Sequence, residues 1–128
     1  MESNVQKEMK IMVTPDKTAK TVGSGLLDVF ATPAMIALME QTAAESVETA
    51  LEAGKTTVGI KINVEHLAAT PVGMEVICKS KLVREENRKL IFEIEAFDES
   101  GLIGTAYHER FIVDSERFRE KTYAKLSK

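Results

Sequence analysis

Three side chains in the first half of the chain have the chemistry for acid–base or nucleophilic work: Thr32, Glu40 and His66. A carboxylate or an imidazole can move protons at neutral pH, and a hydroxyl can hydrogen-bond either group or a developing oxyanion. Each of the three side chains also has an ordinary structural explanation. The helices and strands that position these residues help to decide between a chemical and a structural role. The spacing of apolar residues indicates where those helices and strands lie.

Glu40 interrupts the apolar pattern of a predicted helix. Pro33 suits the first helical position and Gly54 suits the residue just past the end, which predicts a helix of about twenty residues. Almost every residue before Gln41 is apolar, so this half of the helix is expected to be buried on all sides. An ionised carboxylate in such a place costs several kcal/mol unless it has a partner. Glu40 therefore marks either an open edge or a salt bridge of the helix, or a carboxylate that faces a pocket.

His66 interrupts a second pattern, in a predicted strand. From Thr57 the residue types alternate with a period of two, which is typical of a half-buried strand. The apolar members of the pattern are Val58, Ile60, Ile62 and Val64. Strict alternation places His66 next on the same face, where either a satisfied core histidine or a general base would fit. Because a helix and a sheet pack face to face, the acid and the imidazole can point into one space.

Thr32 is predicted to cap the helix. As the N-cap residue its hydroxyl would accept a hydrogen bond from a backbone amide of the next turn. Helix N-termini also carry positive potential and free N–H groups, which can hold a carbonyl oxygen or an oxyanion. The structural and the chemical role are compatible at this position.

The other predicted elements complete a simple layout. The expected strands cover residues 9–13, 57–66, 74–83, 90–97 and 102–113, and a charged helical tail follows from Ser115. One long helix followed by four strands on short turns favours an antiparallel sheet and an α+β fold. All 128 residues, 1–128, are expected to form one domain.

Composition excludes several classes of protein. A formal net charge of −3 gives no support for a nucleic-acid partner. The single cysteine, Cys78, cannot form an intramolecular disulfide, and no apolar run is long enough for a signal peptide or a membrane span, so we expect a soluble cytoplasmic protein. The modest size of the core favours burial of a further face in a dimer.

Weaker motifs have simpler explanations. Gly54–Thr56 looks like the end of a phosphate loop, but Thr49 stands where its first glycine belongs, so nucleotide binding is rejected. Two histidines and one cysteine without close spacing make a metal site improbable, and no cofactor is expected. His108–Arg110 is interpreted as an exposed, charged face of the last strand, and Cys78 as a small buried hydrophobe.

Several segments together carry a resemblance to a known family. They are Val29-Phe30-Ala31-Thr32, Leu38-Met39-Glu40, His66 with Ala68-Ala69 and Pro71-Val72-Gly73, then Gly104, His108-Glu109-Arg110 and residues 118–122. In this order they resemble the fluoroacetyl-coenzyme A thioesterase-like branch of the hot-dog superfamily. The similarity covers nearly the whole chain in register.

The resemblance implies a hot-dog fold, in which a long central helix is wrapped by a five- or six-stranded antiparallel sheet. It also implies an acyl-CoA thioesterase that dimerises by sheet extension, or forms a tetramer, and cleaves a thioester at the dimer interface. The family's catalytic residues match Thr32, Glu40 and His66, and its substrate contacts match Gly59, His66 and Arg110. Glu40 would act as nucleophile or as the base that activates water, with coenzyme A present only as part of the substrate.

One residue departs from the family pattern. The chain carries Leu26 where the member that names the branch has an aromatic residue near the pocket mouth, so we expect a short or medium acyl chain and not fluoroacetyl selectivity. Two other functions suit the same residues: dehydration or hydration of an acyl thioester, and a non-catalytic module that binds acyl-CoA.

Overall fold

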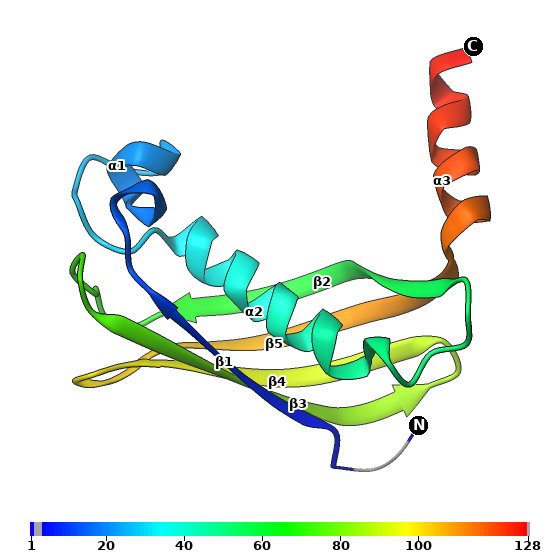
Figure 1. The fold of residues 1–128 in the computed structure, drawn as a ribbon, viewed down its shortest axis with the longest axis horizontal. Coiled ribbons are helices and arrows are strands. Elements are labelled where there is room, and N and C mark those ends of the chain that lie inside the picture. The colour runs from blue at the N-terminus through cyan, green and yellow to red at the C-terminus, as the bar shows by residue number, and fades with distance from the viewer. Residues whose placement is uncertain (2–3, 128) are drawn as a thin grey trace.

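The computed structural model describes residues 1 and 4–127. A long helix lies across one face of a five-stranded antiparallel sheet, with strand order β1-β3-β4-β5-β2 (Figure 1). The strands are β1 (Gln6–Met12), β2 (Lys55–His66), β3 (Glu75–Glu86), β4 (Lys89–Asp98) and β5 (Gly101–Asp114), and the helices are η1 (Pro15–Lys17), α1 (Ala19–Val22), α2 (Thr32–Glu48), α3 (Ser115–Tyr123) and η2 (Ala124–Ser127). The predicted α+β arrangement is confirmed, and β1 and β2 are the edges of the sheet.

The core lies between α2 and the inner face of the sheet. The buried side chains of the helix recur at helical spacing: Met35, Leu38, Met39, Thr42, Ala43 and Val47. They pack on alternate residues of the central strand β4, among them Phe92, Ile94 and Ala96. The expectation that the first half of α2 is buried on all sides is wrong, because Pro33 and Ala37 are exposed.

The long helix ends earlier than predicted. It stops at Glu48, and the amides of Ala50 and Leu51 bond three residues back, to Val47 and Glu48, which tightens the last turn. Gly54 has φ +86° but does not close the helix. Its carbonyl accepts from the amide of Ser115 at 2.9 Å, so it belongs to the turn that leads into β2.

A β-bulge in β2 changes which side chains face the helix. The register with β5 shifts between Gly59 and Lys61, so one extra residue is inserted there. Thr57 and Gly59 face α2 before the bulge, and Ile62 and His66 do so after it. The predicted inward position of Ile60 is therefore wrong, since its side chain is 51% exposed.

The predicted inward position of Val58 is wrong for the same reason. Val58 alternates with Thr57 and Gly59, which both face the helix, so its side chain lies on the outer face of the sheet. Its cross-strand partner there is Phe111, which is 37% exposed. Side chains therefore alternate strictly between the two faces within the part of β2 before the bulge and within the part after it, but not across the bulge.

Two glycines allow α2 to lie close to the sheet. A Cβ built on Gly59 would come 2.7 Å from Oε2 of Glu40, and a Cβ built on Gly104 would come 2.6 Å from Sδ of Met35. A side chain at either position would require the end of the Glu40 or the Met35 side chain to move, and at Gly104 it would also press on the backbone oxygen of Glu65. Gly59 lies in β2 and Gly104 in β5, so side chains of α2 reach both strands at this edge of the sheet through the space that the glycines leave.

The C-terminal helix α3 stands away from the helix–sheet body (Figure 1). It has no buried residue, and outside the terminal segment it contacts mainly β5. Asp114 caps its start by accepting from the amide of Arg117 at 3.0 Å. No helix in the described part of the chain is long and apolar enough to cross a membrane.

Replacing Gly104 with alanine is expected to destabilise the fold by about 1–3 kcal/mol. The added methyl group would meet the flexible end of Met35 and also the backbone oxygen of Glu65 at 3.1 Å, which cannot move aside without disturbing the sheet. Urea denaturation measures the change. Thr105→Ala, on the outer face of the same strand, serves as the control and should stay within about 0.5 kcal/mol of the wild type; equal stability of all three proteins would contradict the close-approach argument.

Candidate active site

Thr32 and His66 form a hydrogen-bonded pair at the start of α2. Oγ1 of Thr32 lies 2.7 Å from Nδ1 of His66, which ends β2. The prediction that Thr32 caps the helix is wrong: Ala31 occupies the cap position, and no side chain caps this end. The Thr32 hydroxyl is therefore free to bond the imidazole, and the chain brings together two of the three predicted catalytic residues.

The other ring nitrogen of His66 has no hydrogen-bond partner. Nε2 is shielded from solvent and bonds to nothing within residues 1 and 4–127. Burial lowers the pKa of the imidazole from its ordinary value of 6.5, while the backbone of Ala68 raises it in part. The ring is thus neutral at neutral pH, the form that can accept a proton.

A pocket of ≈ 320 Å³ adjoins this pair. Its walls are Ala19, Ser24, Val29, Phe30, Thr32, His66, Leu67, Ala68 and Ala69. Small and apolar side chains predominate, which suits a short acyl group next to the hydroxyl and the imidazole. Leu26 does not line the pocket, and its side chain is 90% exposed.

Glu40 lies in a second cluster, further along α2. Its Oε2 is 3.8 Å from Nη1 of Arg110, and the carboxylate sits directly above the Cα of Gly59. The side chain of Glu40 is 42% exposed, so the carboxylate is both paired and open to solvent. The structure therefore supports the first explanation of Glu40, an open edge of the helix with a salt bridge, and Glu40 does not line the pocket beside His66.

Arg110 is buried and held by the sheet. Its Nε donates to Oγ1 of Thr57 at 2.8 Å, and its Nη2 donates to the Thr57 carbonyl at 3.1 Å. Burial lowers the pKa of the guanidinium and the carboxylates of Glu40 and Glu48 oppose that shift, but arginine stays charged in proteins. A fixed cation beside an accessible carboxylate can bind an anionic or carbonyl group of a ligand.

The prediction that His108–Arg110 forms an exposed charged face is wrong. His108 is 0% exposed and Arg110 is 8% exposed, and both face α2. Only Glu109 lies on the outer face. Sequence reasoning missed His108 as a member of the site, although the alternation in Gly104, Ala106 and His108 carries the signal of an inward face.

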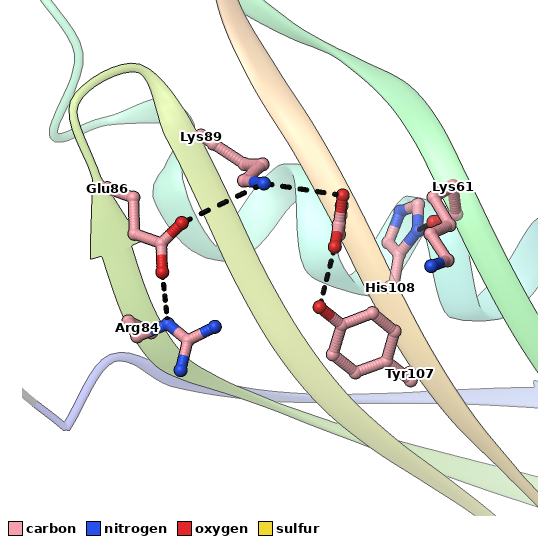
Figure 2. A network of polar contacts seen from close by, with 7 residues as sticks. Lys61, Arg84, Glu86, Lys89, Tyr107 and His108 are labelled. Carbon is pink, nitrogen blue, oxygen red and sulfur yellow. Dashed lines mark hydrogen bonds and ion pairs between the residues drawn. The ribbon is translucent and has the colours of Figure 1, made fainter.

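The outer face of the sheet holds a separate polar network (Figure 2). Glu86 and Glu109 both contact Lys89, at 3.7 and 3.9 Å, and the hydroxyl of Tyr107 donates to Glu109 at 2.6 Å. The Tyr107 hydrogen bond lowers the pKa of Glu109. A larger hollow of ≈ 1060 Å³ lies over this outer surface, with lysine and glutamate side chains among its lining residues, and contains none of the predicted site residues.

The two inner clusters are far apart within one chain. Thr32 and Glu40 are separated by about 12 Å along the helix axis. Gly59, beneath Glu40, is about 20 Å from His66 along β2. Thr32 and His66 thus form one cluster, and Glu40, Gly59 and Arg110 form another.

Comparison with known proteins assigns the chain to a family. The model of the fluoroacetyl-CoA-specific thioesterase family, FlK, matches residues 13–116. The fluoroacetyl-CoA thioesterase of Streptantibioticus cattleyicolor is 37% identical over 98 residues, which are 77% of this chain and 70% of that protein. The chain belongs to this family. It is accordingly a thioester hydrolase, as the resemblance implied.

Solved structures agree with this assignment. A variant of the FlK thioesterase in complex with acetyl-CoA is 30% identical, with a TM-score of 0.93 over 98% of both chains. A hot-dog-like protein from Thermanaerovibrio acidaminovorans is 22% identical, with a TM-score of 0.88 over 98% of this chain and 93% of that one. The hot-dog fold is therefore confirmed.

The thermal stability of the FlK-family chain is expected to fall as the pH is lowered from 7.5 to 5. Burial lowers the pKa of His108 below 6.5, so the unfolded state binds more protons once the pH drops below about 6.5, and acid favours unfolding. The stabilisation is fully present above that pH and is lost below it. His108→Gln should flatten the plot of Tm against pH, whereas an unchanged slope would show that His108 does not contribute.

Proposed function

We propose that the chain hydrolyses a short or medium acyl-CoA thioester and that Thr32, Glu40 and His66 are its catalytic residues. The observation that carries the proposal is the 2.7 Å contact between Thr32 and a neutral His66 at a small pocket beside the start of α2. The family membership supplies the reaction class. The relatives solved with acetyl-CoA, or with fluoroacetate and CoA, support short acyl groups as substrates.

The proposed catalytic site contains residues of two subunits. β2 is an edge strand with a free backbone ladder, so a second copy can pair with it and continue the sheet. In an antiparallel pairing around a two-fold axis near Ile62 and Asn63, His66 lies opposite the partner's Gly59. The Thr32–His66 cluster then faces the partner's Glu40 and Arg110, and each dimer has two complete sites.

The chemistry follows from this placement. The thioester carbonyl lies near the free N–H groups at the start of α2, where developing negative charge on oxygen is favoured. Glu40 of the partner subunit either attacks the carbonyl carbon or takes a proton from the water that attacks it. The C–S bond breaks and the thiolate of CoA receives a proton. If Glu40 is the nucleophile, the acyl group is then held as a mixed anhydride that a water molecule hydrolyses, which regenerates the carboxylate. By either route the products are a carboxylic acid and free CoA.

His66 and Thr32 support proton movement in this scheme. Neutral His66 can accept a proton and return it to the departing sulfur, and its Nε2 has no partner that would have to be displaced. In this scheme Nδ1 of His66 donates to Oγ1 of Thr32, which leaves the lone pair on Nε2, and this hydrogen bond fixes the orientation of the ring. Arg110 and Gly59 are proposed to contact the CoA portion, since Arg110 presents a buried cation and Gly59 leaves open backbone next to it.

Glu40→Gln and His66→Ala are each expected to reduce turnover by about 100-fold or more, because each removes a group that moves protons or attacks carbon. Release of free thiol from a panel of acyl-CoA esters, detected with dithionitrobenzoate, measures the change. Gln41→Ala, an exposed neighbour of Glu40, is the control and should keep wild-type rates. Wild-type rates in either catalytic variant would dismiss the assignment.

The same assay separates the alternative functions. A conjugated enoyl product, seen by its ultraviolet absorbance without thiol release, would indicate a dehydratase. Tight acyl-CoA binding with no product of either kind would indicate a binding module.

A mixture of Glu40→Gln and His66→Ala chains is expected to recover activity. After unfolding and refolding together, about half of the dimers are mixed, and each mixed dimer has one site with an intact Glu40 and an intact His66. The expected rate is about a quarter of the wild-type rate, from two parents that are almost inactive alone. Absence of recovery in a mixture shown to contain mixed dimers would mean that each site is built from a single chain.

A further inference from the structure

His108 is a buried titratable group for which the proposed mechanism has no use. It is 0% exposed and lies on β5 between the core residue Phe92 and the Glu40–Arg110 cluster. A histidine in the core has an aliphatic alternative that would fill the same space without polar atoms. The two hydrogen bonds of the ring indicate why an imidazole stands here.

These bonds define a single protonation state of His108. Nδ1 lies 2.8 Å from the carbonyl oxygen of Lys61, which can only accept, so Nδ1 carries the proton. Nε2 lies 3.2 Å from Nη1 of Arg110, which can only donate, so Nε2 carries the lone pair. The ring is therefore neutral, with its proton on Nδ1.

The β-bulge of β2 supplies the first of these partners. Its irregular register ends at Lys61, whose carbonyl accepts from the imidazole. The same bulge presents Gly59 to Glu40. The bulge thus lies next to both the contact of the carboxylate with the strand and the carbonyl oxygen that orients the histidine.

Arg110 depends on His108 for one side of its guanidinium. Thr57 fixes Nε and Nη2, and His108 holds Nη1, the nitrogen that also lies 3.8 Å from Glu40. Without an acceptor at His108, Nη1 would have no fixed bond on the sheet side, and the ion pair with a carboxylate that is 42% exposed would not hold it alone.

We propose that His108 is a positioning residue that, as a neutral acceptor with its proton on Nδ1, aims Nη1 of Arg110 at Glu40 and at the CoA portion of the substrate. The inference rests on the proposed function, because it assumes that Arg110 contacts CoA. It assigns to His108 a role in substrate affinity that acts only through Arg110.

A mutant cycle with CoA itself as the probe tests this role. His108→Phe fills the cavity but offers no acceptor, and is expected to weaken CoA binding by about tenfold in calorimetry. His108→Gln has a carbonyl oxygen that can take the place of Nε2 and should bind CoA within about threefold of wild type. In an Arg110→Met background, His108→Phe should have no further effect.

The tautomer can be observed directly. The chain has two histidines, so in the His66→Ala protein His108 is the only one left. Side-chain ¹⁵N spectra should show the proton on Nδ1, and a merely space-filling histidine has no reason to hold that tautomer. A proton on Nε2 would overturn the inference.

The outcomes separate the inference from the proposed function. If Arg110→Met weakens CoA binding and His108→Phe does not, or if the two effects simply add, the role of His108 is refuted while the proposed site stands. If Arg110→Met leaves CoA affinity unchanged, the substrate role of Arg110 fails and the inference fails with it. Neither measurement requires turnover.

Discussion

The contacts that side chains of α2 make with the sheet at Gly59 and Gly104 are the constraint on which the arrangement of the site residues depends. A Cβ atom at either glycine would displace the end of the Glu40 or the Met35 side chain. Gly59 lets the carboxylate of Glu40 rest on the strand beside Arg110, and Gly104, paired with His66, lets Met35 pack where β2 ends. Each of the two clusters thus lies next to one glycine, which leaves space for a side chain of α2.

Sequence patterns predicted the long helix, the five strands and the C-terminal helix, and singled out Glu40 and His66 as unusual residues. Apolar spacing gave the long helix, the antiparallel strands and the anomalies at Glu40 and His66, because periodicity reports which positions are buried. Thr32 was found for a reason that proved wrong: its hydroxyl bonds His66 and not the backbone. A contact between side chains far apart in the sequence leaves no trace in local residue spacing. Only the folded structure could therefore show that the Thr32 hydroxyl bonds His66 and not the helix backbone.

The errors in the sheet have two physical origins, an interruption of the alternation in β2 and the burial of charged or titratable side chains in β5. Before the bulge the odd-numbered residues of β2 face the helix, and after it the even-numbered residues do. No residue type in that stretch predicts the change. The charged triplet 108–110 was assigned to the surface because buried charges are rare, yet Arg110 and His108 satisfy each other's hydrogen bonds inside. Burial of a charged side chain is unfavourable on average, but hydrogen-bond partners inside the protein can offset its free-energy cost.

The bulge also fixes the length of β2. Successive side chains in a strand point to opposite faces. One inserted residue therefore changes whether odd- or even-numbered residues beyond it face the helix, and one deleted residue would change this back. A deletion between residues 59 and 62 would restore even pairing with β5 and would leave both Gly59 and Ile62 facing the helix. It would, however, remove the irregular backbone at Lys61, whose carbonyl oxygen accepts a hydrogen bond from His108. The extra residue is therefore needed for the orientation of the imidazole and not for the inward position of the residues on either side.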